Sequence, residues 1–145
     1  MNGTWGEEQL IADGFERVTV ELEWYDGLRA GLAGVGGEPH YFDGYGQYTG
    51  DGPGEYRVWP APPAAVAWEH EQWAIRLRWS GQRGEGAPDP ALGGVDARYD
   101  ELDALLAGHR QEPPDARLLA GEVRHTGAGD GPEGTGYWVR WRLHC

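Results

Sequence analysis

Asp26 and His40 are the two residues whose types come nearest to acid–base chemistry. A carboxylate and an imidazole can pass a proton near neutral pH when their surroundings tune their pKa values. Both residues lie within segment 16–45, which is expected to form a sheet, so curling of that sheet would bring them together. A structural interpretation is simpler and is favoured. Asp26 then makes a hairpin turn with Gly27, and His40 fills a sheet position beside Pro39.

Other catalytic groups are scarce. The chain has no Lys, which excludes Schiff-base catalysis and P-loop phosphate binding. Its one Ser, Ser80, lies outside any nucleophile-elbow motif. Residues 129–134 match G-x-G-x-x-G, but they lie between two expected strands and open no helix, which indicates a hairpin loop. The five His residues lack the spacing of a zinc site, so neither a metal nor another cofactor is expected. No enzyme class is indicated.

One set of aromatic and arginine residues is typical of a recognition surface. Trp, Tyr and Arg are enriched at the hot spots of protein interfaces. An aromatic-lined pocket for a small ligand uses the same residue types. The candidates are Trp24, Tyr25, Tyr41, Tyr45, Tyr48, Arg76, Arg78 and Trp79. Several of these rings would also suit an ordinary core.

Residues 16–45 are expected to form a three-stranded meander. The first strand alternates apolar with polar side chains, the period-2 pattern of a half-buried strand. Asp26-Gly27 is a favoured hairpin turn between the first and second strands. Gly36-Gly37 is a second turn, between the second and third strands.

Residues 64–80 fit two structures. As a strand, the apolar residues from Trp73 to Trp79 alternate with Ala and Arg; as a helix, the apolar residues line two opposite faces. The Ala and Glu content before Trp73 favours the helix. A second, amphipathic helix is expected from a cap at Asp96 to about Arg110.

The remaining elements lead to an α+β fold. Residues 55–59 are a short strand candidate, and 117–126 with 136–144 read as a C-terminal hairpin. The meander and this hairpin are expected to form one antiparallel sheet with two helices on one face. Residues 1–15 are expected to be a loose N-terminal arm, and 16–145 a single α+β domain. In the last strand, we expect Arg140 and Arg142 to pair with Glu21 and Glu23 across neighbouring strands.

The charge balance is strongly acidic. Twelve basic residues, all Arg, stand against 24 Asp and Glu, for a formal net charge of −12. Residues 1–60 hold eleven acids and three Arg, and residues 61–145 hold thirteen acids and nine Arg. Such a field repels phosphate backbones, so nucleic-acid binding is not expected, whereas a basic protein would be attracted. The simpler interpretation is that the acidity only keeps the chain in solution.

Composition also bears on the compartment. Cys145 is the only cysteine, so no intramolecular disulfide can form. No apolar run approaches the roughly 20 residues of a membrane span, and the N-terminal residues lack the features of a signal peptide. We expect a cytoplasmic protein with no membrane partner.

Two stretches carry a sequence likeness. The first runs from Tyr25-Asp26-Gly27 to Pro39-His40-Tyr41-Phe42, and the second is Glu71-Gln72-Trp73-Ala74-Ile75 with Arg78-Trp79. The pattern resembles a group of small uncharacterised bacterial proteins, over about residues 16–106. The resemblance implies a folded domain. It carries no activity to this chain, because the group has no established function.

Two classes of function therefore remain open. The first is a small acidic binding protein, of inhibitor, immunity or regulatory type, that engages a basic protein partner. The alternative is a small-molecule-binding protein, or an enzyme that uses Asp, Glu or His chemistry in an aromatic-lined pocket. The lack of nucleophiles and the charge favour the first class.

Overall fold

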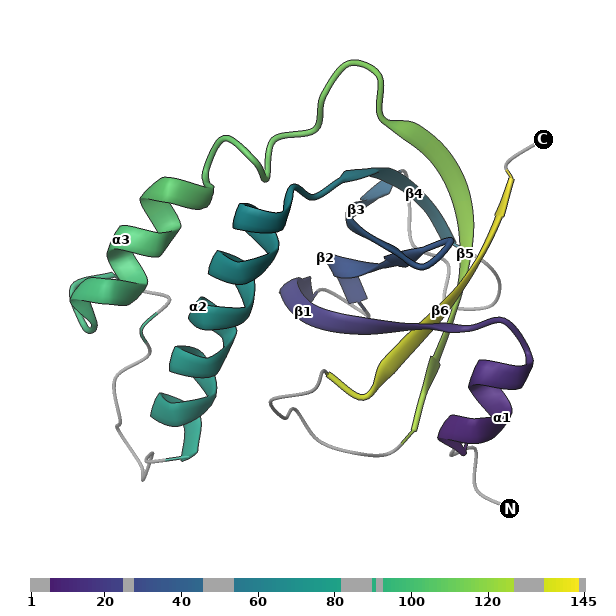
Figure 1. Ribbon diagram of the computed structural model, residues 1–145, viewed down its shortest axis with the longest axis horizontal. Helices are drawn as coiled ribbons and strands as arrows, with labels where there is room; N and C mark the ends of the chain where they lie inside the picture. The colour runs from purple at the N-terminus through teal and green to yellow at the C-terminus, as the bar shows by residue number, and fades with distance from the viewer. Residues whose placement is uncertain are drawn as a thin grey trace. The chain divides into compact units, whose positions relative to one another are not determined.

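The computed structural model describes residues 6–24, 28–45, 54–81, 90, 93–126 and 135–143. The chain divides into two compact units. The barrel unit comprises Met1–Ala61 and Glu112–Cys145, and the helical unit comprises Pro62–Gln111. Figure 1 labels the helices and strands of both units.

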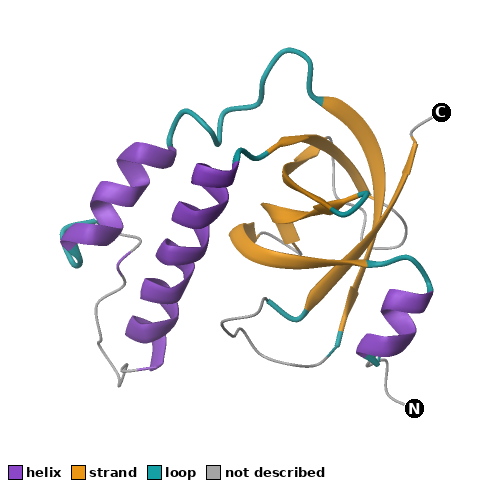
Figure 2. Ribbon diagram, in the orientation of Figure 1, coloured by secondary structure: helices purple, strands orange, loops and turns teal. Residues whose placement is uncertain are grey.

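Six antiparallel strands of the barrel unit close into a barrel (Figure 2). Each strand pairs with the next along the chain, and the last pairs with the first. The strands are β1 (Glu16–Trp24), β2 (Leu28–Val35), β3 (Glu38–Tyr45), β4 (Gly54–Pro60), β5 (Arg117–His125) and β6 (Tyr137–Leu143).

The predicted open sheet with two helices on one face is wrong. β1 pairs with β6 through Glu16 opposite Val139 and Arg17 opposite Trp138, and this pairing closes the barrel. The physical reason is that a twisted sheet whose strands tilt and stagger can satisfy its own edges by closing. The meander itself is confirmed, since β1, β2 and β3 pair in order, and so is the hairpin of β5 and β6.

The glycine turn between β2 and β3 is held by a carboxylate. Gly36 and Gly37 both take positive φ, 63° and 85°, which side chains with a Cβ rarely adopt. Their N–H groups donate to the two carboxylate oxygens of Glu16 at 2.9 and 2.7 Å. Glu16 on β1 therefore fixes the turn that the glycines predict.

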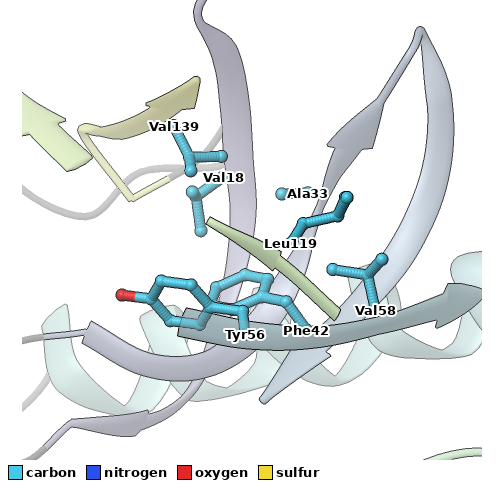
Figure 3. Packing of buried hydrophobic residues seen from close by; sticks show 7 residues of the cluster. All are labelled: Val18, Ala33, Phe42, Tyr56, Val58, Leu119 and Val139. Atoms are coloured by element: carbon cyan, nitrogen blue, oxygen red, sulfur yellow. The ribbon is translucent and has the colours of Figure 1, made fainter. Parts of the chain in front are cut away.

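Aromatic side chains and valines fill the barrel (Figure 3). Phe42, Tyr56 and Trp141 meet edge to face, with ring centroids 5.6 to 5.9 Å apart. Glycine makes room for them: a Cβ on Gly121 would lie 3.0 Å from both the Tyr56 and the Trp141 rings. The other core residues that Figure 3 labels are Val18, Ala33, Val58, Leu119 and Val139.

A short helix, α1 (Glu7–Ala12), precedes the barrel strands. It lies within the stretch expected to be a loose arm. Leu10 of α1 is fully buried in a small cluster with Phe15 and Trp138. α1 is thereby attached to the barrel unit through apolar contact.

The helical unit contains α2 (Pro63–Gly81) and α3 (Ala97–Leu106), which pack against each other. The helical interpretation of residues 64–80 is confirmed. The predicted cap is confirmed as well, because the Asp96 carboxylate accepts from the Tyr99 N–H at 3.0 Å. α3 ends at Leu106, earlier than expected. No helix of the described residues is long and apolar enough to cross a membrane.

Candidate functional site

The predicted recognition residues of the barrel unit divide between buried and undescribed positions. Tyr41 is 1% exposed and stacks on Trp59, with ring centroids 5.7 Å apart. Trp24 and Tyr45 lie in β1 and β3, but their side chains are outside the described part of the chain. Tyr25 and Tyr48 are outside the described residues as well. Within the described part of the barrel unit, this set forms no aromatic patch.

The predicted recognition residues of α2 contact neighbours within the helical unit. The Arg76 guanidinium lies 5.7 Å from the Trp73 ring centroid. The Trp79 indole N–H donates to the Asp96 carboxylate at 3.0 Å, and an Arg78 nitrogen lies 3.8 Å from the same carboxylate. Arg78 and Trp79 thus meet at the cap of α3, where they hold the two helices together.

The candidate acid–base pair receives no support from geometry. His40 is 8% exposed and lies in β3, with its Nδ1 2.9 Å from the carbonyl oxygen of Glu38. Asp26 lies outside the described residues. The placement of His40 agrees with the structural interpretation, in which it fills a sheet position.

A polar network joins α2 to the segment after α3. Glu69 is fully buried, and its two carboxylate oxygens accept from the Arg110 guanidinium at 2.7 and 2.9 Å. Arg110 also donates to Asp103 and Gln72. Burial lowers the pKa of Arg110, but hydrogen bonds and charge from Glu69 and Asp103 outweigh it and raise that pKa above its usual value. The Glu69 carboxylate is therefore held in an ion pair with Arg110.

The outer surface of β1, β5 and β6 carries a group of four arginines, called here the arginine face. Side chains alternate between the two sides of a strand. Val18, Val123 and Val139 pack in the barrel core, so the residues beside each of them point outward. The arginine face consists of Arg17 on β1, Arg124 on β5, and Arg140 and Arg142 on β6.

Three of these guanidinium groups lie over aromatic rings. Arg17 is 4.8 Å from the Trp138 ring centroid. Arg140 and Arg124 are 4.9 and 5.9 Å from the Phe15 ring centroid. Stacking of this kind fixes a guanidinium plane while its N–H edge stays available for polar partners.

Carboxylates of the same unit bind the arginine face. Glu122 accepts from Arg140 at 2.8 Å and from Arg124, and Glu7 of α1 pairs with Arg17. The hydrogen bond from Arg140 chiefly lowers the pKa of Glu122 below its usual value, against the raising effect of desolvation. The positive charges of Arg124, Arg140 and Arg142 lower it further.

The predicted partners of the C-terminal arginines differ from the observed one. Arg140 and Arg142 were expected to reach Glu21 and Glu23, but Arg140 pairs with Glu122 on β5. β6 meets β1 only at Glu16 and Arg17 in the described register, so the expected partners are not its neighbours.

Arginines elsewhere are also neutralised by carboxylates. Arg57 lies 3.8 Å from Glu112, and Arg98 makes two hydrogen bonds with Glu71 at 2.7 and 2.8 Å. With the pairs given above, seven arginines form ion pairs within the described part of the chain: Arg17, Arg57, Arg78, Arg98, Arg110, Arg124 and Arg140.

Sequence reasoning missed the arginine face as a unit. Arg17 and Arg124 stand beside core valines, so the alternation that identifies the strands also places them outside. The alternation does not show that β6 pairs with both β1 and β5. This pairing brings the four arginines onto one surface.

Among the described residues, no three His, Cys, Asp or Glu side chains are grouped to hold a metal ion. No family model, curated protein or solved structure matched the chain. The resemblance to a group of small bacterial proteins therefore stays a prediction.

Proposed function

We propose that this chain is a small cytoplasmic binding protein, of inhibitor, immunity or regulatory type, that engages a basic protein partner. The observation that carries the proposal is a formal net charge of −12 combined with arginines that are largely paired with the chain's own carboxylates. A field of this sign speeds encounter with a positively charged protein.

The barrel unit is the proposed binding unit. It carries sixteen Asp and Glu against seven Arg, whereas the helical unit carries eight against five. Its exposed acids include Glu8 on α1, Glu38 at the start of β3 and Asp115 before β5. The greater part of the negative charge thus belongs to the barrel unit.

The alternative of a small-molecule site has less support. It requires aromatic side chains that line an open pocket. Inside the barrel, the described rings of Phe42, Tyr56 and Trp141 contact one another. These rings serve packing, so no catalytic step is proposed.

The test is affinity capture from a lysate of the native host, at low and at high ionic strength, read by mass spectrometry. We expect one basic protein in stoichiometric amount that is lost at high ionic strength, because salt screens exposed charges. Capture of no basic protein, or capture that is indifferent to salt, would overturn the proposal.

Two matched variants locate the interaction. Glu38→Gln with Asp115→Asn removes two exposed charges from the barrel unit. Asp100→Asn with Glu101→Gln removes one half-buried and one exposed charge from α3. The asparagine keeps an oxygen for the Gly94 N–H that Asp100 binds at 2.9 Å. Capture should fall more for the barrel variant. Equal loss in both variants would show that the barrel unit is not the binding unit.

A further inference from the structure

We propose that the arginine face is a second binding surface, which docks an acidic peptide segment of a protein partner. This inference does not rest on the basic partner proposed above, since the two use charges of opposite sign. Its basis is the charge, the exposure and the fixed geometry of Arg17, Arg124, Arg140 and Arg142.

The first argument is that positive charge is concentrated on this surface. The barrel unit has seven arginines, and four of them point outward from three adjacent strands. Trp138 on β6 is the pairing partner of Arg17 on β1 and of Arg124 on β5. Arg140 on β6 is the pairing partner of Glu122 on β5. Among the described residues, the carboxylates that pair with these four arginines are those of Glu7 and Glu122, so arginines outnumber their acidic partners there.

The second argument is preorganisation. The side chains of Arg17, Arg124 and Arg140 are 30%, 33% and 31% exposed, so each side chain is partly covered and partly open. Their contacts with the rings of Trp138 and Phe15 restrict rotamers before any partner arrives. A binding surface that is already ordered loses less entropy on association.

The third argument is that the face already accepts carboxylates. Glu122 bridges Arg124 and Arg140, and Glu7 reaches Arg17 from helix α1. The carboxylates of an acidic peptide would make the same kind of contact with these arginines as Glu7 and Glu122 do. Arg142 is exposed, and no ion pair of Arg142 occurs among the residues that the structure describes. It is the arginine best placed to meet an additional carboxylate.

The length of the partner segment follows from the charge around the face. A long polyanion such as a nucleic acid would extend beyond the four arginines onto a surface with excess acid, where it is repelled. A short acidic peptide can remain within the face. At physiological salt its charges interact mainly over roughly 8 Å, so the nearest arginines dominate.

The experiment uses the full chain and fluorescein-labelled hexaglutamate, with binding followed by fluorescence anisotropy at low ionic strength. We expect saturable binding. Arg142→Gln should weaken it about fivefold, and Arg124→Gln by a similar factor. Arg117→Gln is the matched control, because Arg117 is also exposed and lies on β5 outside the arginine face. It should leave the affinity almost unchanged.

Three outcomes would overturn the inference. The first is no binding of hexaglutamate at low ionic strength. The second is an equal effect of Arg142→Gln and Arg117→Gln, which would mean that overall charge and not this face decides. The third is tighter binding of a single-stranded oligonucleotide of the same charge, which would replace the peptide with a phosphate-bearing partner. Because Arg142 is exposed, its substitution should leave the fold intact, which a thermal melt of each variant checks.

Discussion

Gly121 lies in β5 opposite Trp141, at the point where the aromatic rings fill the barrel. A Cβ there would lie 3.0 Å from both the Tyr56 and the Trp141 side chains, tighter than nine in ten real Cβ contacts. Neither ring can move far, because each packs against the other and against Phe42. A larger residue at this position would therefore crowd the two rings.

We predict that Gly121→Ala lowers the free energy of unfolding by about 1–3 kcal/mol, the usual cost of overpacking a core. Gly108→Ala is the control, since a Cβ at Gly108 would meet no atom within 4 Å, and it should change stability by about 0.5 kcal/mol or less. Urea denaturation of both variants gives the comparison. Equal stabilities would mean that the aromatic packing is looser than described.

Asp96 combines a helix cap with a charged hydrogen bond. The indole N–H of Trp79 chiefly lowers the pKa of Asp96 below its usual value of 3.8. The backbone N–H of Tyr99 adds to this effect, while desolvation opposes it. A lowered carboxyl pKa stabilises the fold at pH values above 3.8, and the contribution is lost as the pH falls through 3.8 toward the folded value.

We predict that the wild type is more stable than Asp96→Asn at neutral pH and that this advantage shrinks as the pH falls below about 4. Urea denaturation at a series of pH values measures it. Trp79→Phe should reduce the pH-dependent part, because it removes the principal donor and leaves the Tyr99 bond. An advantage that stays constant down to about pH 3 would contradict the assigned hydrogen bond.

At the scale of elements, two ion pairs of very different exposure join α2 to α3 and to the segment that follows it. Glu69 is fully buried and pairs with Arg110, whereas Arg98 pairs with Glu71 at the surface. Removing one partner of a buried pair leaves an uncompensated charge, but an exposed pair contributes little.

We therefore predict that Arg110→Gln destabilises the helical unit by about 3 kcal/mol, and that Arg98→Gln costs about 1 kcal/mol or less. The two changes are the same substitution, and each breaks an ion pair between α2 and the segment that begins with α3. Thermal melts followed by helical circular dichroism report both. A larger loss of stability for Arg98→Gln than for Arg110→Gln would contradict the claim that the Glu69–Arg110 pair is the more important one.

The six strands and the helices α2 and α3 could be predicted from the sequence because their signals are local, whereas the short helix α1 was expected to be a loose arm. Gly36 and Gly37 mark a turn, and Asp96 caps a helix, with no information from distant residues. Closure of the barrel could not be predicted in this way. The pairing of Glu16 with Val139 joins opposite ends of the chain, and the alternation of a strand is the same in an open sheet and in a barrel.

The same difference separates the predicted from the observed site residues. Trp79 has the residue type of an interface hot spot, but it donates to Asp96, which only the packing of α2 on α3 reveals. Tyr41 was a recognition candidate and is buried against Trp59. The arginine face needed the register of three strands, so residue types alone did not identify it.

At the scale of the whole molecule, charge is the property that the sequence states most plainly. The 24 acidic residues exceed what ion pairing with twelve Arg can cancel, which leaves the net charge of −12, and the pairs described above use most of those arginines. A chain with this balance attracts basic partners at a distance, while the arginine face acts only at close range. Two surfaces of opposite sign would let one small protein discriminate between partners by charge.

The central claim is that negative charge drives association with a basic protein. The most direct measurement is the association rate constant of the captured partner, determined at several salt concentrations. Electrostatic steering predicts a rate constant that falls at least about tenfold between low and high ionic strength, with a smaller change in the dissociation rate. A rate constant that does not change with salt would contradict the claim.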